Sequence, residues 1–180
     1  MIETQHSLLI EAPIATVWQY VEDMRRWANL LPGCQECIVE NQEDSRWILK
    51  VGTGGLVRTV TALVHVDQWA GPGRVDFSYK LEGDPVEGGG SYLASEMSPT
   101  QTEVSLQLRV QGSGPLAPMW EAISRPLLPR LAKMFATKLK EEIEQASLPE
   151  HGDTSQSTVQ SARPSLTQKI RNLLSSHEKD

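Results

Sequence analysis

The sequence predicts an α+β fold in which a curved antiparallel sheet wraps around one long C-terminal helix, with two short helices after the first strand. Three observations carry this prediction. A strand-like run leads directly into a proline-started amphipathic helix, residues 36–111 repeat apolar side chains with period two, and residues 115–146 repeat them every three or four positions. A sheet with one apolar face needs a cover, and the long helix supplies it.

The first strand is expected at about Thr4 to Glu11. Pro13 then suits the first turn of a helix, because a backbone N–H would have no partner there. The apolar residues that follow recur at helical spacing: Ile14, Val17, Trp18 and Val21. A second short helix is expected to carry Met24, Trp27, Leu30 and Leu31 before Pro32 and Gly33 end it.

Six further strands are expected, separated by turn-rich segments: Glu36–Asn41, Arg46–Gly52, Leu56–Gln68, Arg74–Leu81, Gly90–Met97 and Glu103–Gln111. Their connections are short, which favours an antiparallel meander over parallel crossovers. Alternation of apolar and polar residues gives the sheet one covered face and one solvated face.

The covering helix is predicted over Pro115 to Ala146, with apolar residues at Trp120, Ile123, Leu127, Leu131, Met134, Phe135, Leu139 and Ile143. Pro126 and Pro129 interrupt its first half. Because proline removes a helical hydrogen bond, we expect a kink or break near Ser124 and Arg125, with a regular helix only after it.

Three segments are expected: a ligand-binding domain over 1–146, a flexible polar linker over 147–162, and an amphipathic helix over 163–176. The helix would present Leu166, Ile170, Leu173 and Leu174 on one face, flanked by Lys169 and Arg171. So short a helix is marginal alone in water and is expected to order against an anionic membrane, a partner protein or its own domain. The sequence leaves these three open.

Composition excludes several classes of protein. The net charge of −6 over 180 residues disfavours general nucleic-acid binding, which requires clustered cations. No apolar run approaches the ~18 residues of a membrane span. The N-terminal residues show no basic stretch followed by an apolar core, so the chain is expected in the cytoplasm.

Motifs for metal binding or catalysis are weak. Cys34 and Cys37 form the single C-x-x-C, but a structural zinc site needs four ligands, and strand positions three apart point to opposite faces. The four histidines stand alone, at His6, His65, His151 and His177. We therefore expect no metal site and no catalytic constellation.

Three consecutive glycines, Gly88 to Gly90, lead into the predicted strand that starts at Gly90. Glycine weakens a strand, so the run marks either a sharp bend of a curved sheet or a place where a ligand or another backbone comes close. The bend is the simpler interpretation.

The segment Ala12 to Cys34, closed by Leu31-Pro32-Gly33-Cys34, and the entry Gly112-Ser113-Gly114-Pro115 into the long helix resemble the CoxG-like family, which takes its name from a carbon monoxide dehydrogenase protein. This family is part of the START/SRPBCC superfamily, whose fold is the helix-grip. The resemblance extends over roughly residues 3–145.

The resemblance implies an apolar cavity between sheet and helix, and a non-catalytic carrier or adaptor for a quinone or lipid. It also implies a molybdenum hydroxylase-type partner, peripheral contact with the inner face of the cell membrane, and no required cofactor. The residues expected to line the cavity are Trp47, Leu49, Phe77, Tyr79, Leu106, Leu108, Trp120, Ile123, Leu127, Leu131, Met134 and Phe135.

Two alternatives compete with the carrier. An enzyme of the aromatase/cyclase type would need an ionisable residue facing the cavity, for which the candidates are Glu96, Asp76, His6 and His65. By alternation, Asp76 faces away from Phe77 and is the weaker choice. A ligand-free protein-interaction module would instead have a fully packed interior.

Overall fold

Seven strands and three α-helices form the part of the chain that this computed structural model describes, residues 1–53 and 55–148. In chain order they are β1 Ile2–Ile10, α1 Ile14–Val21, α2 Met24–Leu30, β2 Cys34–Val39, β3 Asp44–Thr53, β4 Leu56–Ala70, β5 Arg74–Leu81, β6 Val86–Ser98, β7 Gln101–Gly112, the 3₁₀ turn η1 Gly114–Leu116, and α3 Ala117–Ser147. The predicted α+β fold is confirmed. The predicted linker beyond residue 148 and the predicted helix over 163–176 lie outside the described residues.

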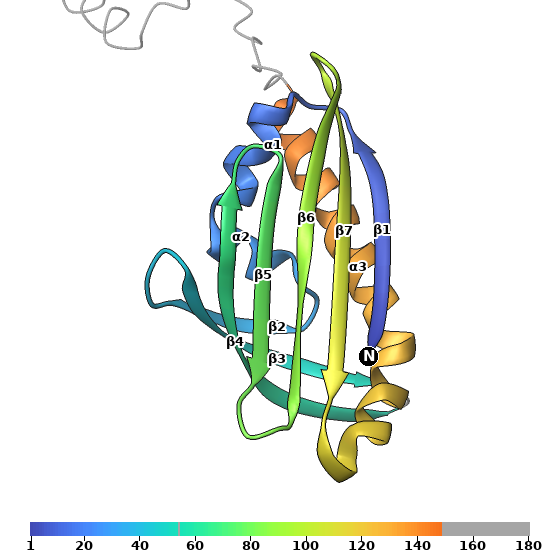
Figure 1. Ribbon diagram of the computed structural model, residues 1–180. Helices are drawn as coiled ribbons and strands as arrows, with labels where there is room; N and C mark the ends of the chain where they lie inside the picture. The colour runs from blue at the N-terminus through green and yellow to red at the C-terminus, as the bar shows by residue number, and fades with distance from the viewer. Residues whose placement is uncertain (54, 149–180) are drawn as a thin grey trace, which may run out of the picture. The chain divides into compact units, whose positions relative to one another are not determined.

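All seven strands belong to one antiparallel sheet, ordered β1-β7-β6-β5-β4-β3-β2. Strands β2 to β7 form the expected meander, and β1 joins at the edge of β7, where His6 pairs with Leu106. Figure 1 shows the result: β5, β6 and β7 stand side by side, while the far ends of β3 and β4 cross behind them. The sheet is therefore strongly curved.

Helix α3 covers the concave side along β1 and β7 and makes few contacts with β3 (Figure 1). Its C-terminal half packs into a dense core, where Leu139 and Ile143 are completely buried with Ile10, Val17 and Val104. The N-terminal half of α3 packs Trp120 and Leu128 against Val86 and Val110, and the interior beside that half holds an apolar cavity.

We expected a kink or a break near Ser124 and Arg125, and the break is wrong, because α3 is continuous from Ala117 to Ser147. Pro126 and Pro129 both lie on its exposed side. Each proline leaves the carbonyl four residues earlier without an N–H partner, at Ala122 and Arg125, which are also exposed. Water can hydrate these carbonyls, so the helix tolerates both prolines.

The C-x-x-C also differs from expectation. A β-bulge at Gln35 shifts the register of β2, so that Cys34 pairs with Leu49 and Cys37 with Trp47, both of which face inward. The two cysteines therefore pack against the core from the same side of the strand, as free thiols. Burial raises the pKa of both thiols, which makes them poor nucleophiles.

The convex face of the sheet carries a polar network centred on Asp76. Arg74 donates to both carboxylate oxygens of Asp76, at 2.6 and 3.0 Å, and Ser91 donates at 2.5 Å. These hydrogen bonds, the one from Arg74 foremost, lower the pKa of Asp76. The network joins β5 to β6 on the side away from the cavity.

Acid should therefore weaken the fold partly through Asp76. Because its pKa is lower in the folded than in the unfolded chain, its stabilisation is complete above the unfolded value of about 3.9 and is lost as the pH falls below it. Urea unfolding measured between pH 6 and pH 3 should show a smaller loss of stability for Asp76→Asn than for the wild type. An identical pH dependence in both proteins would contradict this role.

Candidate ligand-binding site

An apolar cavity of about 190 Å³ lies between the concave face of the sheet, the α1–α2 segment and the N-terminal half of α3. Every strand from β3 to β7 contributes inward-facing side chains. Its wall consists of Val21, Trp27, Leu31, Trp47, Leu49, Val51, Val60, Ala62, Val64, Phe77, Tyr79, Leu81, Val86, Tyr92, Leu106, Leu108, Val110, Trp120, Ile123, Ser124, Leu127, Leu128, Leu131 and Phe135.

The structure places all of the predicted lining residues on this wall except Met134. Met134 is 45% exposed on the outer side of α3. The helix turns by about 100° per residue, so Leu131 and Phe135 lie on the cavity side while Met134 falls beyond its edge. Binding of a ligand by the remaining residues stays a prediction.

Sequence reasoning missed the contribution of the α1–α2 segment to the cavity. Val21, Trp27 and Leu31 close one side of it. From the sequence, these three residues belong to the apolar faces of two short helices. Those apolar faces are the only sequence feature that could have indicated their place on the cavity wall. Tyr92 was missed as well, although it alternates in step with Gly88 and Gly90 along β6.

Aromatic side chains form one end of the cavity. Trp27 and Phe77 are on its wall, with ring centroids 5.9 Å apart in an edge-to-face arrangement. Trp69 packs behind Trp27 at 5.8 Å, and Trp18 packs on Trp69 at 6.1 Å. Such a cluster gives a rigid wall that suits a planar ring by stacking or edge contact.

Two of the three glycines of β6, Gly88 and Gly90, allow the aromatic wall to lie close to the sheet. Gly90 pairs with Phe77 and Gly88 with Tyr79. A Cβ atom on Gly90 would lie 2.7 Å from the Phe77 ring and 3.0 Å from Leu108, and one on Gly88 would collide with the Tyr79 ring. The glycines thus make room for two cavity-lining rings, which explains them better than a bend alone.

Most polar atoms near the cavity have hydrogen-bond partners. Trp47 donates its indole N–H to Ser45 Oγ at 2.8 Å, and Trp27 donates to the carbonyl of Val21. Tyr79 donates its hydroxyl to the carbonyl of Arg109 at 3.2 Å. The hydroxyl of Tyr92 and the indole N–H of Trp120 are buried and have no partner among the described residues.

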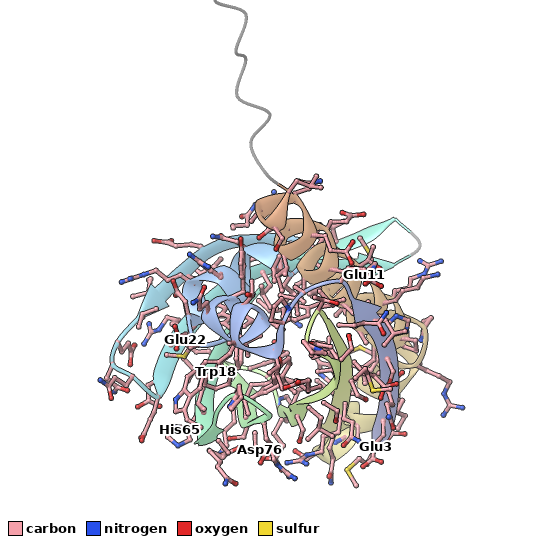
Figure 2. All side chains as sticks on the ribbon, turned by 90° about the horizontal axis from the view of Figure 1, so that it is seen from above. Glu3, Glu11, Trp18, Glu22, His65 and Asp76 are labelled. Carbon is pink, nitrogen blue, oxygen red and sulfur yellow. The ribbon has the colours of Figure 1, made fainter. Side chains whose placement is uncertain are left out.

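The ionisable residues considered for catalysis lie away from the cavity. Asp76 is on the convex face, as alternation predicted, and His65 points outward from the same face, as Figure 2 shows. His65 pairs with Asp44 at 2.7 Å, and this hydrogen bond raises the pKa of the imidazole. Glu96 is exposed near the end of β6, and His6 is half-buried in β1 outside the wall. The titratable groups on the wall are the phenols of Tyr79 and Tyr92.

Burial sets the protonation of these phenols. It raises the pKa of Tyr79 to about 12, against a smaller opposing effect of the Arg109 charge, and it raises the pKa of Tyr92 further. Both hydroxyls are therefore protonated at neutral pH and available as hydrogen-bond donors.

At the end of the cavity away from the aromatic cluster, an ion pair lies beside Trp120. Arg58 of β4 pairs with Asp84 of the β5–β6 loop at 3.0 Å, and its guanidinium lies 5.7 Å from the centre of the Trp120 ring. Trp120 packs there on Val86 and Val110. Arg58 thus fixes both the loop and the tryptophan that bounds this end.

A larger, more open depression of about 540 Å³ crosses the outer side of the sheet. Its lining mixes charges of both signs, with Glu40, Asp44 and Glu87 beside Arg46, Lys80 and Arg109. It has neither the enclosure nor the uniform chemistry of the cavity, so the cavity is the better candidate for a ligand site.

No helix among the described residues is both long enough and apolar enough to cross a membrane. Within residues 1–53 and 55–148 there is also no cluster of three or more His, Cys, Asp or Glu side chains arranged to hold a metal ion.

Solved structures of similar fold come from several bacteria. A conserved protein of Geobacillus kaustophilus matches with a TM-score of 0.70 at 16% identity, over 81% of this chain and 97% of its own. The Zhui aromatase/cyclase of Streptomyces sp. R1128 matches at 0.60 and 18% identity, over 84% and 98%. A START superfamily protein of Mycobacterium smegmatis matches at 0.62 and 14% identity, over 81% and 99%.

These likenesses support the START/SRPBCC-like fold predicted from the sequence. No curated protein is a significant match to the sequence. The model of the family described as polyketide cyclase/dehydrase and lipid transport matches residues 1–144, which is most of the chain. The protein therefore belongs to the polyketide cyclase/dehydrase and lipid transport family.

Proposed function

We propose that this protein is a non-catalytic carrier that holds a hydrophobic small molecule in the cavity between its sheet and α3. The observation that carries the proposal is the cavity itself, whose wall is almost wholly aliphatic and aromatic. A protein interior is normally packed to the density of an organic crystal, so a hollow of this size is kept at a cost in stability. Uptake of an apolar ligand would offset that cost.

The volume sets the size of the ligand. A cavity of about 190 Å³ exceeds the roughly 150 Å³ that takes up benzene in an engineered protein core. It is smaller than most pockets for drug-sized ligands. It therefore suits a small ring system, and a longer alkyl or isoprenoid chain would extend outward between α3 and β3, where the helix makes few contacts.

The edge of α3 beside the cavity has the side chains expected of a surface that binds a membrane reversibly. Leu116 of the preceding turn η1 and Met119 and Met134 of α3 are all close to half exposed there, next to the lining residues. Arg130 and Lys133 are exposed on the same helix. Apolar side chains flanked by cations favour reversible contact with anionic lipid, and the predicted helix over 163–176 would add to it.

The resemblance to the CoxG-like family of carbon monoxide dehydrogenase makes the proposal more specific. We propose a quinone as the ligand, a molybdenum hydroxylase-type oxidoreductase as the partner, and the inner face of the cell membrane as the site of exchange. A quinone combines a small flat ring with an apolar chain, and the volume and apolar wall of the cavity suit the ring.

An aromatase/cyclase-type enzyme is the second candidate, favoured by the family and by the likeness in fold to the Zhui aromatase/cyclase. The two functions differ in the fate of the ligand. A carrier releases the molecule unchanged, whereas a cyclase returns a product of altered structure, which mass spectrometry of the extracted ligand detects.

Titration with 2,3-dimethyl-1,4-naphthoquinone tests the carrier function directly. The two methyl groups of this quinone block covalent addition of the free cysteine thiols, so the titration measures reversible binding alone. Trp27, Trp47 and Trp120 are on the cavity wall, so quenching of their fluorescence reports binding. We expect saturable binding of one ligand per chain. Absence of binding to this quinone, and of transfer of a long-chain quinone between vesicles, would overturn the carrier and favour an interaction module.

Membrane contact makes a separate prediction. Met119→Asp combined with Met134→Asp should lower retention on vesicles containing anionic phosphatidylglycerol about tenfold, because two exposed apolar contacts are replaced by charges that the vesicle repels. Ring binding in solution should be unchanged. Leu63→Asp, on the convex face, serves as the control. Equal retention of both variants would contradict this surface, and loss of retention only on deletion of residues 163–176 would assign the contact to the tail.

A further inference from the structure

A fully buried hydroxyl without a hydrogen-bond partner among the described residues distinguishes one part of the cavity wall. Tyr92 is 3% exposed, lines the cavity and donates no hydrogen bond to any described residue. A buried polar group without a partner is costly, so native proteins satisfy nearly all of them. An exception on the wall of a cavity indicates a partner that arrives from outside the chain.

The neighbouring tyrosine shows that the sheet itself is able to satisfy such a group. Tyr79 lines the same cavity from the adjacent strand β5, and its hydroxyl reaches the backbone carbonyl of Arg109. Among the tryptophans of the wall, Trp27 and Trp47 also have intramolecular acceptors. Tyr92 is as buried as Trp27 and Trp47 and more buried than Tyr79, and it differs from all three in its missing acceptor.

We propose that Tyr92 donates a hydrogen bond to an acceptor atom on the ring of the bound ligand and thereby determines which ring systems the cavity retains. The inference rests on the carrier function proposed above and adds the chemistry of its ligand. The ligand is an apolar ring that carries a carbonyl or ether oxygen.

The position of Tyr92 agrees with a ring-binding role. Tyr92 pairs with Val75 of β5, two residues from Phe77, and belongs to the same core cluster as Trp27. A planar ring held by the aromatic end of the cavity would therefore lie beside the strand position of Tyr92. A neutral acceptor suits the site, because the described residues of the wall include no Lys, Arg or His to balance an anion.

Trp120, the other wall residue whose buried donor has no partner among the described residues, lies in a different part of the cavity from Tyr92. Its unpaired indole N–H belongs to the end of the cavity near Val110, and Tyr92 pairs with Leu106 on the same strand. Four residues of strand correspond to about 13 Å, which one small ring does not span. The inference for the ring therefore concerns Tyr92 alone.

A pair of matched ligands and a pair of matched variants test this assignment. The ligands are 2,3-dimethyl-1,4-naphthoquinone and 2,3-dimethylnaphthalene, which share one carbon skeleton and differ in the two carbonyl oxygens. The variants are Tyr92→Phe and, as control, Tyr79→Phe, which removes a hydroxyl that is already paired inside the protein. Dissociation constants are measured by equilibrium dialysis.

Tyr92→Phe should weaken binding of the quinone about five- to thirtyfold and leave binding of the hydrocarbon unchanged. Tyr79→Phe should not discriminate between the two ligands. Equal effects of Tyr92→Phe on both ligands, or no effect on either, would overturn the inference while leaving the carrier function intact. If the wild type binds neither ligand, both the inference about Tyr92 and the carrier function are overturned.

The ligand-free protein provides a second readout. Because the Tyr92 hydroxyl has no partner among the residues that the structure describes, its removal should leave the melting temperature equal or higher, whereas Tyr79→Phe should lower it. A clear loss of stability in ligand-free Tyr92→Phe would show that the hydroxyl has a structural partner and would contradict the assignment.

Discussion

Phenylalanine in place of Ala62 should abolish uptake of 2,3-dimethyl-1,4-naphthoquinone, with affinity at least thirtyfold lower, while the protein stays folded. Ala62 is buried on the cavity wall in β4, between Trp47 and Leu81 of the neighbouring strands. A benzyl group there would occupy the space that a ligand ring needs. Filling a cavity also adds apolar contacts, so the melting temperature should not fall.

Two further variants make this test sharp. Leu63→Phe adds a ring at the next residue of β4, on the convex face, and should leave binding unchanged. Ala62→Leu fills less of the cavity and should give an intermediate loss if phenylalanine proves too large to pack. Wild-type affinity in a folded Ala62→Phe protein would show that the quinone binds elsewhere.

Gly90→Ala should destabilise the protein by about 2–4 kcal/mol, a large effect for one methyl group. A Cβ at this position would meet the backbone carbonyl of Gln107 as well as the Phe77 ring, 2.7 Å away, and Leu108. The carbonyl belongs to the paired strand and cannot turn aside. Relief would require separating β6 from β7 or pushing Phe77 into the cavity.

Gly73→Ala is the matched control, because a Cβ at Gly73 would have its nearest neighbour at 3.5 Å, an ordinary contact. Its cost should stay below about 1 kcal/mol. Urea unfolding of both variants measures the difference. Equal stabilities would contradict the close packing of aromatic rings over the glycines of β6.

The fold was predictable because its signals are local. Period-two alternation located the strands to within a few residues of their bounds, and the span Arg74–Leu81 agrees at both ends. The continuity of α3 was not predictable in this way. Whether a proline breaks a helix depends on which side of the helix it occupies, and that side is set by tertiary packing.

The site was predictable only in part, for a related reason. Two patterns identified side chains that meet around one cavity: the alternation of apolar and polar residues along β3, β5 and β7, and the helical spacing of apolar residues in α3. Both patterns indicate the direction in which a side chain points. The bulge at Gln35, which brings two cysteines to one side, leaves no such pattern. Neither does the missing partner of Tyr92, since a hydrogen bond depends on atoms brought together from distant strands.

The central claim is that the cavity binds an apolar small molecule. Native mass spectrometry of the protein isolated from its own cells tests it most directly, with Ala62→Phe isolated in parallel. We predict that the wild type carries one small molecule per chain, extractable unchanged into organic solvent, and that the variant carries none. A wild-type mass equal to that of the bare chain, together with no uptake of added quinone, would contradict the account.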